Sequence, residues 1–307
     1  SARPKLLHPH GHETRIPRVR HRAMLRWAIS SVPNYASKVG TCASRERVMQ
    51  QELWKIPADW FVRWFNTPAY HRLYGPRDQA EADAFVDVLA DNVFAGLNNG
   101  RLLECACGAG RHAIRFAQHG ITVHGMDLAE NSIARARERA KELGLASPQI
   151  QFSTGDMRNP DHVAAHGPYD AITLLFTSFG YFTSDEEHLQ TLRNFHDSLA
   201  AGGMFVLDFL NVHKVQRELV EHEVLTRSGK TFEVWRRIQA GWIEKAIQYQ
   251  QGGQTHLHHE RVRAFDVDIL SQMMDEIGFH LHSVVGDYRL HPWTEDSPRL
   301  ILICQKQ

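Results

Sequence analysis

Cysteine is scarce in this sequence, and the cysteines present are scattered. Cys42, Cys105, Cys107 and Cys304 are the four among 307 residues. Disulfide frameworks belong to short, cysteine-dense secreted domains, so this pattern favours a reducing compartment. We therefore expect a cytoplasmic protein without a disulfide framework.

Long apolar runs are also missing. The longest ones, residues 171–176 and 300–304, have the length of a strand. A helix that crosses a bilayer needs about 18 or more consecutive apolar residues. The sequence therefore argues against a membrane-spanning role and a membrane partner.

Acidic residues are nearly absent from one end of the chain. Residues 1–50 hold ten Lys and Arg but only Glu13 and Glu46 as acids, although the whole chain has a net charge of zero. The segment is rich in Arg, His and Pro and lacks the apolar core of a secretory signal. This composition is typical of a basic arm or of a presequence remnant for organellar import. We predict a flexible basic extension over residues 1–55; binding of nucleic acid through residues 1–50 is an alternative with only this weak support.

From residue 56 the pattern is regular. Residues 56–100 combine an aromatic helical repeat with an amphipathic helix, which predicts a helical lid. Over residues 101–211 strands alternate with helices, as in a parallel sheet covered on both faces. The expected strands are 101–107, 122–127, 150–156, 169–176 and 204–210, and the expected helices are 111–119, 131–143 and 186–199.

The rhythm changes after residue 211. Residues 212–265 show period-two alternation interrupted by Ser228-Gly229 and Gly252-Gly253, which predicts antiparallel hairpins that form a cap and substrate region. Residues 266–307 are expected to return to the core with a last helix at 266–277 and strands at 281–288 and 300–305. An exposed edge of the cap sheet could pair with a second copy and give a homodimer.

The stretch 101-RLLECACGAGRHAIRF-116 contains a glycine loop. Gly108, Gly110 and Ala113 satisfy G-x-G-x-x-G/A between a strand and a helix, and Asp127 follows about 20 residues later, as in dinucleotide-binding folds. Cys105 and Cys107 are spaced too closely for the usual zinc pair, so we expect small apolar residues and no metal. Taken alone, the loop also fits a nicotinamide-dependent oxidoreductase.

Two further acids distinguish the ligands that such a loop could bind. Glu104 stands directly before the loop, where a carboxylate would repel a pyrophosphate and attract an ammonium group. Asp156 follows the third strand and can accept a hydrogen bond from an adenine amino group. Together with Asp127, these acids form a constellation on three successive strands.

Several motifs resemble a known family. "LLECACGAGRH", "GMDLAENSIARAR" and "FSTGDMR" are similar to the first three motifs of class I S-adenosylmethionine-dependent methyltransferases. "FTSFGYF" and the closing "GDYRLHPWTEDSPRLILICQK" resemble a branch of small, mostly bacterial members. The resemblance runs over about residues 60–306. It implies a methyltransferase with S-adenosyl-L-methionine as cofactor and a doubly wound, Rossmann-like α/β fold whose seven-stranded sheet includes an antiparallel strand, with a β-rich cap insertion and an N-terminal helical lid.

The resemblance also implies roles for particular residues. Those expected to hold the methionine part of the cofactor are Glu104 and the backbone of Cys105, Ala106, Gly108 and Gly110. Those expected around the ribose and adenine are Asp127, Leu128, Gly155, Asp156 and Met157. Phe176 and Thr177 are expected beside the sulfonium, and the expected lid residues are Tyr70, Tyr74 and Arg77, with Arg77 a candidate for the cofactor carboxylate.

The methyl acceptor is less well defined. No [DN]-P-P-[YFW] motif is present, which disfavours methylation of a nucleobase amine. Tyr181 takes the position of a histidine proposed as the base in amino-sugar N-methyltransferases; with a pKa of about 10 it would orient a nucleophile or serve as a pocket wall. His259 and His291 are candidate general bases because histidine titrates near neutrality.

We therefore expect methyl transfer to N or O of a small-molecule acceptor. Three alternatives remain open at this point: an RNA or protein methyltransferase that docks through the basic arm, a nicotinamide-dependent oxidoreductase, and a non-catalytic ligand sensor.

Overall fold

The computed structural model describes residues 52–74, 79–97 and 99–307. Residues 1–51 of the expected basic extension over residues 1–55, and the lid residue Arg77, lie outside the described residues. The fold below is that of one unit, Leu53–Gln307.

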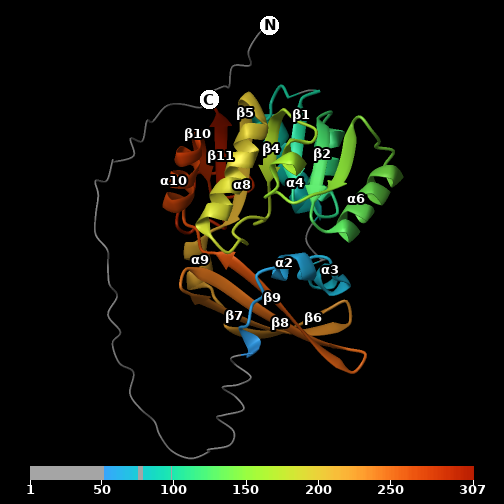
Figure 1. Cartoon of the computed structure of the whole chain (residues 1–307), viewed down its shortest axis with the longest axis vertical. Coiled ribbons are helices and arrows are strands. Elements are labelled where there is room, and N and C mark those ends of the chain that lie inside the picture. Colours follow the sequence, from blue (N-terminus) through green and yellow to red (C-terminus); the bar gives the residue numbers. More distant parts are fainter. Residues whose placement is uncertain (1–51, 75–78, 98) are drawn as a thin grey trace, which may run out of the picture. The chain divides into compact units, whose positions relative to one another are not determined.

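The unit contains a seven-stranded sheet in the order β10-β11-β5-β4-β1-β2-β3 (Figure 1). Its strands are parallel except β11, which runs antiparallel to both β5 and β10. The bounds are β1 Arg101–Cys105, β2 Thr122–Asp127, β3 Ile150–Thr154, β4 Tyr169–Leu174, β5 Leu199–Leu210, β10 Phe279–Val285 and β11 Arg299–Lys306. This order confirms the predicted doubly wound α/β fold with an antiparallel strand.

Helices cover both faces of this sheet because successive side chains of a buried strand point to opposite sides. In β1, Leu102 and Leu103 are both 0% exposed, and they belong to two separate core clusters. The helices of the first cluster are α4 Gln79–Asn92, α5 Arg111–Gln118 and α6 Glu130–Glu142. Those of the second are α7 Pro160–Ala164, α8 Asp185–Ser198 and α10 Val267–Ile277.

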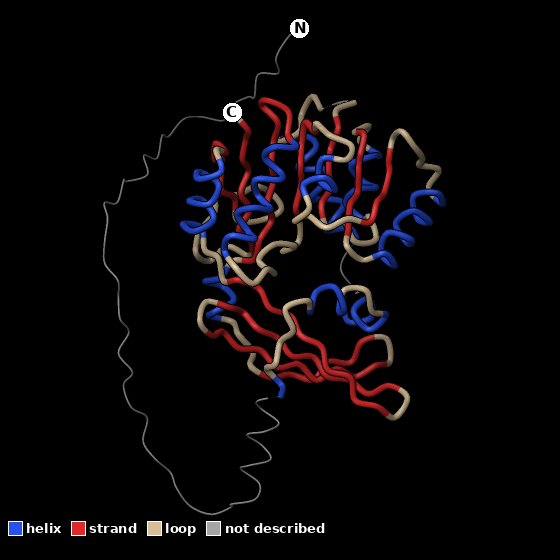
Figure 2. The backbone as a smooth tube through the Cα atoms, in the orientation of Figure 1, coloured by secondary structure: helices blue, strands red, loops and turns tan. Residues whose placement is uncertain are grey.

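A second sheet of four antiparallel strands forms the cap (Figure 2). It follows the short helix α9 Val212–Arg217 and consists of β6 His222–Arg227, β7 Lys230–Gln239, β8 Trp242–Gln251 and β9 Gln254–Arg263. Each hairpin turns at a two-residue loop in which both residues have positive φ, namely 228–229, 240–241 and 252–253. Such turns match the twist of the strands and favour glycine. The sequence pattern had indicated the first and last turn but not Ala240-Gly241.

One face of the cap sheet packs on two helices that precede the core, α2 Trp60–Trp64 and α3 Pro68–Tyr74. The contact is a third apolar cluster in which Trp60 and Trp64 meet Phe232 and Ile247. Cap and helical segment thus share one apolar core, which also includes Phe182, although they are far apart in the sequence.

Among the described residues no helix is both long enough and apolar enough to cross a membrane.

Candidate active site

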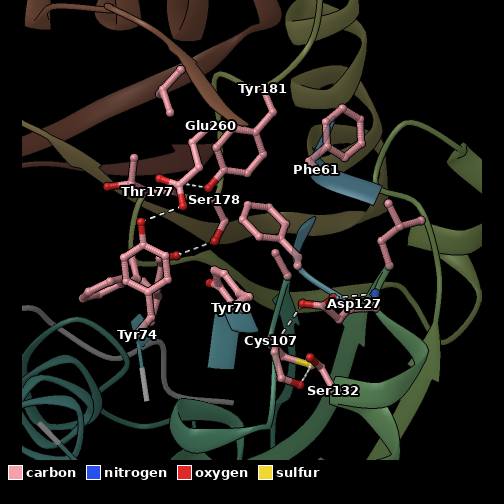
Figure 3. A pocket seen from close by; sticks show the side chains of 18 of the residues that line it. Phe61, Tyr70, Tyr74, Cys107, Asp127, Ser132, Thr177, Ser178, Tyr181 and Glu260 are labelled. Atoms are coloured by element: carbon pink, nitrogen blue, oxygen red, sulfur yellow. Dashed lines mark hydrogen bonds between the residues drawn. The ribbon is translucent and has the colours of Figure 1, made fainter. Parts of the chain in front are cut away.

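A cavity of about 590 Å³ lies where the carboxyl ends of β1 to β4 meet the cap and α2–α3 (Figure 3). Four loops of the parallel sheet contribute to its wall, those at 105–111, 127–129, 155–157 and 175–178. Ligands of doubly wound sheets bind at this edge, outside the carboxyl ends of the strands. The cap contributes Arg236, Ile243, Lys245, Glu260 and Val262 to the same wall.

The glycine loop after β1 is left-handed at both glycines, with φ of 55° at Gly108 and 74° at Gly110. A Cβ at Gly108 would meet nothing within 4 Å, so the cavity is open beside this backbone. A Cβ at Gly110 would lie 2.9 Å from Phe152 Cζ and 3.1 Å from Ala136 Cβ. Gly108 thus lets a ligand approach, whereas Gly110 lets α6 and β3 pack.

Cys105 and Cys107 flank this loop as buried thiols, 1% and 5% exposed. Burial raises the pKa of both thiols well above the usual value. They are therefore protonated at neutral pH and pack as small apolar side chains.

Asp127 connects the loop after β1 to the loop after β2 through hydrogen bonds. Its Oδ2 accepts from Gly108 N at 2.8 Å and its Oδ1 accepts from Ala129 N at 2.7 Å. Burial raises the pKa of the carboxyl, and these two amide bonds oppose the effect. A carboxylate has about four acceptor positions, so Asp127 retains capacity for two hydroxyl groups on the cavity side.

Glu104 lies behind the cavity wall rather than on it, and it is 2% exposed. His112, which does line the cavity, bonds to Glu104 Oε1 through Nδ1 at 2.9 Å. Among the described residues, Glu104 Oε2 has no hydrogen-bond partner. A buried carboxylate with an unpaired oxygen favours positive charge nearby, so this end of the cavity suits an ammonium group better than a pyrophosphate.

Asp156 is paired with Arg158, which the sequence reasoning missed. Arg158 Nη2 donates to Asp156 Oδ2 at 2.7 Å, and Arg158 N donates to Oδ1 at 2.9 Å. Burial alone would raise the pKa of Asp156, but the bonds and charge of Arg158 outweigh burial and lower it. The guanidinium also lies over the rings of Phe61 and Phe182, 5.5 and 5.3 Å from their centroids. Arg158 therefore joins the Asp156 loop to the aromatic wall.

The loop after β4 has an unusual backbone, because Phe176 and Thr177 both have φ of 60°. A left-handed β-branched residue is rare and must be held by its surroundings. Asp208 Oδ2 accepts from Phe176 N at 2.8 Å, and Arg299 Nη2 donates to Thr177 Oγ1 at 2.9 Å. Sequence reasoning missed both partners; an acid within the apolar run "MFVLDFL" was the available signal.

Tyr181 lines the cavity, and its hydroxyl donates to the backbone oxygen of Thr177. Its ring makes an edge contact with Trp60 at a centroid distance of 5.2 Å and stacks on Phe61 at 6.3 Å. Tyr181 is therefore both an aromatic wall and a tie to the loop after β4.

A hydrogen-bonded cluster on the cap face was also missed. Glu260 Oε1 accepts from Trp64 Nε1 at 2.8 Å and from Tyr74 Oη at 2.6 Å. Lys245 Nζ donates to Glu260 Oε2 at 2.6 Å and to Tyr74 Oη at 2.7 Å. Burial would raise the pKa of Glu260, but Lys245 and the other donors outweigh it and lower the pKa. In Figure 3, Tyr74 and Glu260 point toward one another.

The structure does not bring the two candidate histidines to the cavity. Strand alternation turns His259 away from the face of Glu260, and its Nε2 donates to Leu53 O at 3.0 Å. The side chain of His291 is 66% exposed and bonds to Asp287 Oδ2 at 2.7 Å through Nδ1. Neither belongs to the cavity wall, so the structure does not bring these two candidate general bases to the site.

Most residues expected around the cofactor do meet at one cavity. Those on its wall are Tyr70, Tyr74, Cys105, Ala106, Gly108, Asp127, Leu128, Gly155, Asp156, Met157, Phe176 and Thr177. Glu104 and Gly110 lie directly behind it.

Known proteins are similar to this chain in sequence or in fold. The family model of the methyltransferase domain matches residues 102–203. A glycine/sarcosine N-methyltransferase of Parasynechococcus marenigrum (strain WH8102) is 26% identical over 228 residues, 70% of this chain and 74% of that protein. An S-adenosylmethionine-dependent methyltransferase from Clostridium acetobutylicum aligns with a TM-score of 0.66 at 15% identity, over 78% of this chain and 96% of that one. CalS10 from Micromonospora echinaspora is an amino pentose methyltransferase solved with S-adenosylmethionine. It aligns with a TM-score of 0.56 at 20% identity, over 78% of this chain and 98% of that one.

The open backbone at Gly108, the carboxylate of Asp127 and the unpaired Oε2 of Glu104 fit this cofactor, which carries ribose hydroxyls and an ammonium group. With the family match over the same loops, within residues 102–203, they lead to one conclusion: the chain carries a methyltransferase domain of the class I S-adenosylmethionine-dependent type, and S-adenosylmethionine is its cofactor.

Proposed function

We propose that this enzyme methylates a nitrogen or oxygen atom of a small-molecule acceptor by in-line displacement. The observation that carries the proposal is that one cavity of about 590 Å³ joins the glycine loop and Asp127 to an aromatic, partly charged wall beneath the cap. In Figure 3, Asp127 and Glu260 lie on opposite sides of this space. One continuous space can therefore take a nucleoside cofactor and a small second molecule together.

The cofactor end would be formed by the loops of the parallel sheet. Asp127 would accept the ribose hydroxyls, and Leu128 and Met157 would flank the adenine. The negative charge of Glu104 would favour the ammonium group from behind the wall. S-adenosylmethionine, when bound, supplies a methyl group that its sulfonium already activates. The chain's own work is then to position both reactants and exclude water.

The acceptor end would be formed by aromatic side chains from α2, α3 and the loop after β4. Aromatic walls exclude water and tolerate the positive charge that a methylated amine acquires. The ones that line the cavity are Trp60, Phe61, Phe65, Tyr70, Tyr181 and Phe182. Tyr181, tied to Thr177, would position the acceptor rather than remove its proton. A neutral amine has a free lone pair, so its proton can leave to solvent after the transfer.

One relative named above is a glycine/sarcosine N-methyltransferase, and another similar protein is an amino pentose methyltransferase; both names denote acceptors that carry an amine. Amines are therefore the first acceptor class to test, followed by phenols, hydroxy acids and thiols.

The test is a screen of these classes with the full chain, in which release of S-adenosylhomocysteine and the mass of the product are measured together. We expect stoichiometric methylation of an amine or a hydroxyl group. Cofactor binding without turnover on any class would contradict the proposal and favour a sensor. Methylation of RNA or protein, lost when residues 1–50 are removed, would contradict it as well.

A further inference from the structure

We propose that the acceptor carries an anionic group, of the carboxylate type, and that Arg236 and Lys245 on the cap bind it. This inference rests on the proposed function, because it names the class of acceptor that the same cavity takes.

The first observation is the register of the cap sheet. Arg236 of β7 lies directly opposite Lys245 of β8, and Lys245 lies directly opposite Glu260 of β9. All three side chains line the cavity. Like charges directly opposite one another on one face of a sheet are destabilising. The neighbouring cations Arg236 and Lys245 therefore favour an anion on the cavity side.

The second observation is that both cations retain donors. An ammonium group has three donors and a guanidinium five. Lys245 Nζ uses two donors, on Glu260 and Tyr74. Arg236 donates through Nη2 to Glu223 and through Nη1 to Val220 O, and among the described residues nothing accepts from its Nε. The two side chains are 21% and 22% exposed, so the remaining donors are accessible to a ligand.

The third observation concerns the charge that a ligand would meet. Glu260 already accepts three hydrogen bonds, from Trp64, Tyr74 and Lys245, which leaves about one of its four acceptor positions. A cationic ligand would therefore compete with Lys245 for this carboxylate. An anionic ligand would instead bridge Lys245 and Arg236 without displacing any bond. The wall thus selects an anion over a cation.

The opposite face of the same sheet provides a contrast. There Arg237 Nε donates to Glu244 at 2.6 Å, and the guanidinium lies over Trp54 at 4.2 Å. Arg261 pairs with the same carboxylate at 3.3 Å. On that face one acid lies between the two cations, whereas on the cavity face the two cations are neighbours and their acid partners, Glu223 and Glu260, lie on the outer strands.

The test uses two probes that differ in charge but hardly in size, 3-phenylpropanoate and 3-phenylpropanamide. Each is titrated by calorimetry into the full chain saturated with S-adenosylhomocysteine. We expect the carboxylate to bind at least tenfold more tightly than the amide. Equal affinities, or a preference for the amide, would overturn the proposal.

Variants test whether Arg236 and Lys245 cause the preference for the carboxylate. Arg236→Gln removes one cation, and the double variant Lys245→Met/Glu260→Gln removes the other together with its buried partner. Each should reduce the preference for the carboxylate to less than threefold while leaving the affinity for S-adenosylhomocysteine unchanged. Arg227→Gln, an equal loss of charge at an exposed hairpin end, should retain the full preference and serves as the matched control.

The conservative variants Arg236→Lys and Lys245→Arg keep the charge and should keep the preference. They also decide the matter if a charge-removing variant fails to fold, because loss of the preference in a folded, charge-conserving variant would overturn the proposal. Because binding is measured without turnover, the result for the anion site is independent of the result for the proposed function. A preference for the carboxylate without methylation of any small molecule would support the anion site and contradict the proposed function. Methylation of acceptors without any preference for the anionic probe would support the proposed function and contradict the anion site.

Discussion

Asp208 and Arg299 form a buried ion pair on adjacent strands of the large sheet, with Arg299 Nε donating to Asp208 Oδ1 at 2.7 Å. The side chain of Asp208 is 1% exposed. Its other oxygen accepts from Phe176 N, and Arg299 also bonds to Thr177. The pair therefore lies beneath the loop after β4 and holds its left-handed backbone in place.

Arg299→Met should destabilise the protein by about 3–5 kcal/mol, because it leaves the Asp208 charge buried without its partner. Urea unfolding followed by circular dichroism measures the change. The double variant Asp208→Asn/Arg299→Met removes both charges and should recover part of the loss. A single variant as stable as the parent would show that the pair is not what holds this loop.

Asp127→Ala should weaken the binding of S-adenosylmethionine at least tenfold, since it removes the acceptor for the ribose hydroxyls and the tie between Gly108 and Ala129. A tenfold loss corresponds to about 1.4 kcal/mol. Calorimetry with S-adenosylhomocysteine measures it. Asp170→Ala is the matched control, because that carboxylate bonds to Arg101 N and does not line the cavity. Unchanged affinity in Asp127→Ala would remove the central assignment of the cofactor site.

Tyr181→Phe should lower kcat more than it weakens cofactor binding. The ring that packs on Trp60 and Phe61 is retained, and only the bond to Thr177 O is lost. We expect a several-fold fall in kcat and less than a twofold change in the affinity for S-adenosylhomocysteine. The opposite pattern would make Tyr181 a cofactor residue.

His188 should make the fold sensitive to acid. The residue is 0% exposed, its Nε2 accepts from Phe182 N at 3.2 Å, and burial lowers its pKa to about 4. The unfolded chain takes up this proton near pH 6.5, so stability is full above that pH and falls as the pH drops from 6.5 towards 4. Between pH 7 and 5.5, His188 should contribute a loss of about 1 kcal/mol.

Urea unfolding of His188→Gln at these two pH values checks this contribution, because glutamine can accept the same bond but does not titrate. The variant should lose less stability than the parent between the two conditions. An identical loss in both proteins would assign the acid sensitivity to other groups, such as His124 and His258, whose pKa values burial also lowers to about 4.

The sequence predicted the sheet well, because its signals are local. The strand over Thr122–Asp127 was predicted to the residue, and the predicted helix 131–143 differs by one residue at each end from Glu130–Glu142. The predicted strand 101–107 ends earlier, at Cys105, because the glycine loop begins there. Apolar runs, glycines and strand-end acids are enough to define a cofactor edge without knowledge of the rest of the chain.

The acceptor wall could not be predicted in the same way, because it depends on contacts between distant segments. Tyr74 and Glu260 are 186 residues apart, and neither belongs to a motif that points to the other. The lid tyrosine was expected at the cofactor, yet its hydroxyl bonds to the cap. His259 was a candidate only because of its residue type, and strand alternation, not chemistry, decided that its neighbour Glu260 faces the cavity.

The alternation of the cap strands has a consequence for how such enzymes diversify. Lys245 lies between Arg236 and Glu260 on the cavity face, while its neighbour Glu244 points to the other side. A shift of β8 by one residue would exchange these two side chains, so the cation in the middle of the wall would become an anion. The same shift would turn Ile247 and Tyr249 away from the apolar cluster beneath the cap, so we expect the charge of this wall to change by substitution and not by a slip of the strand.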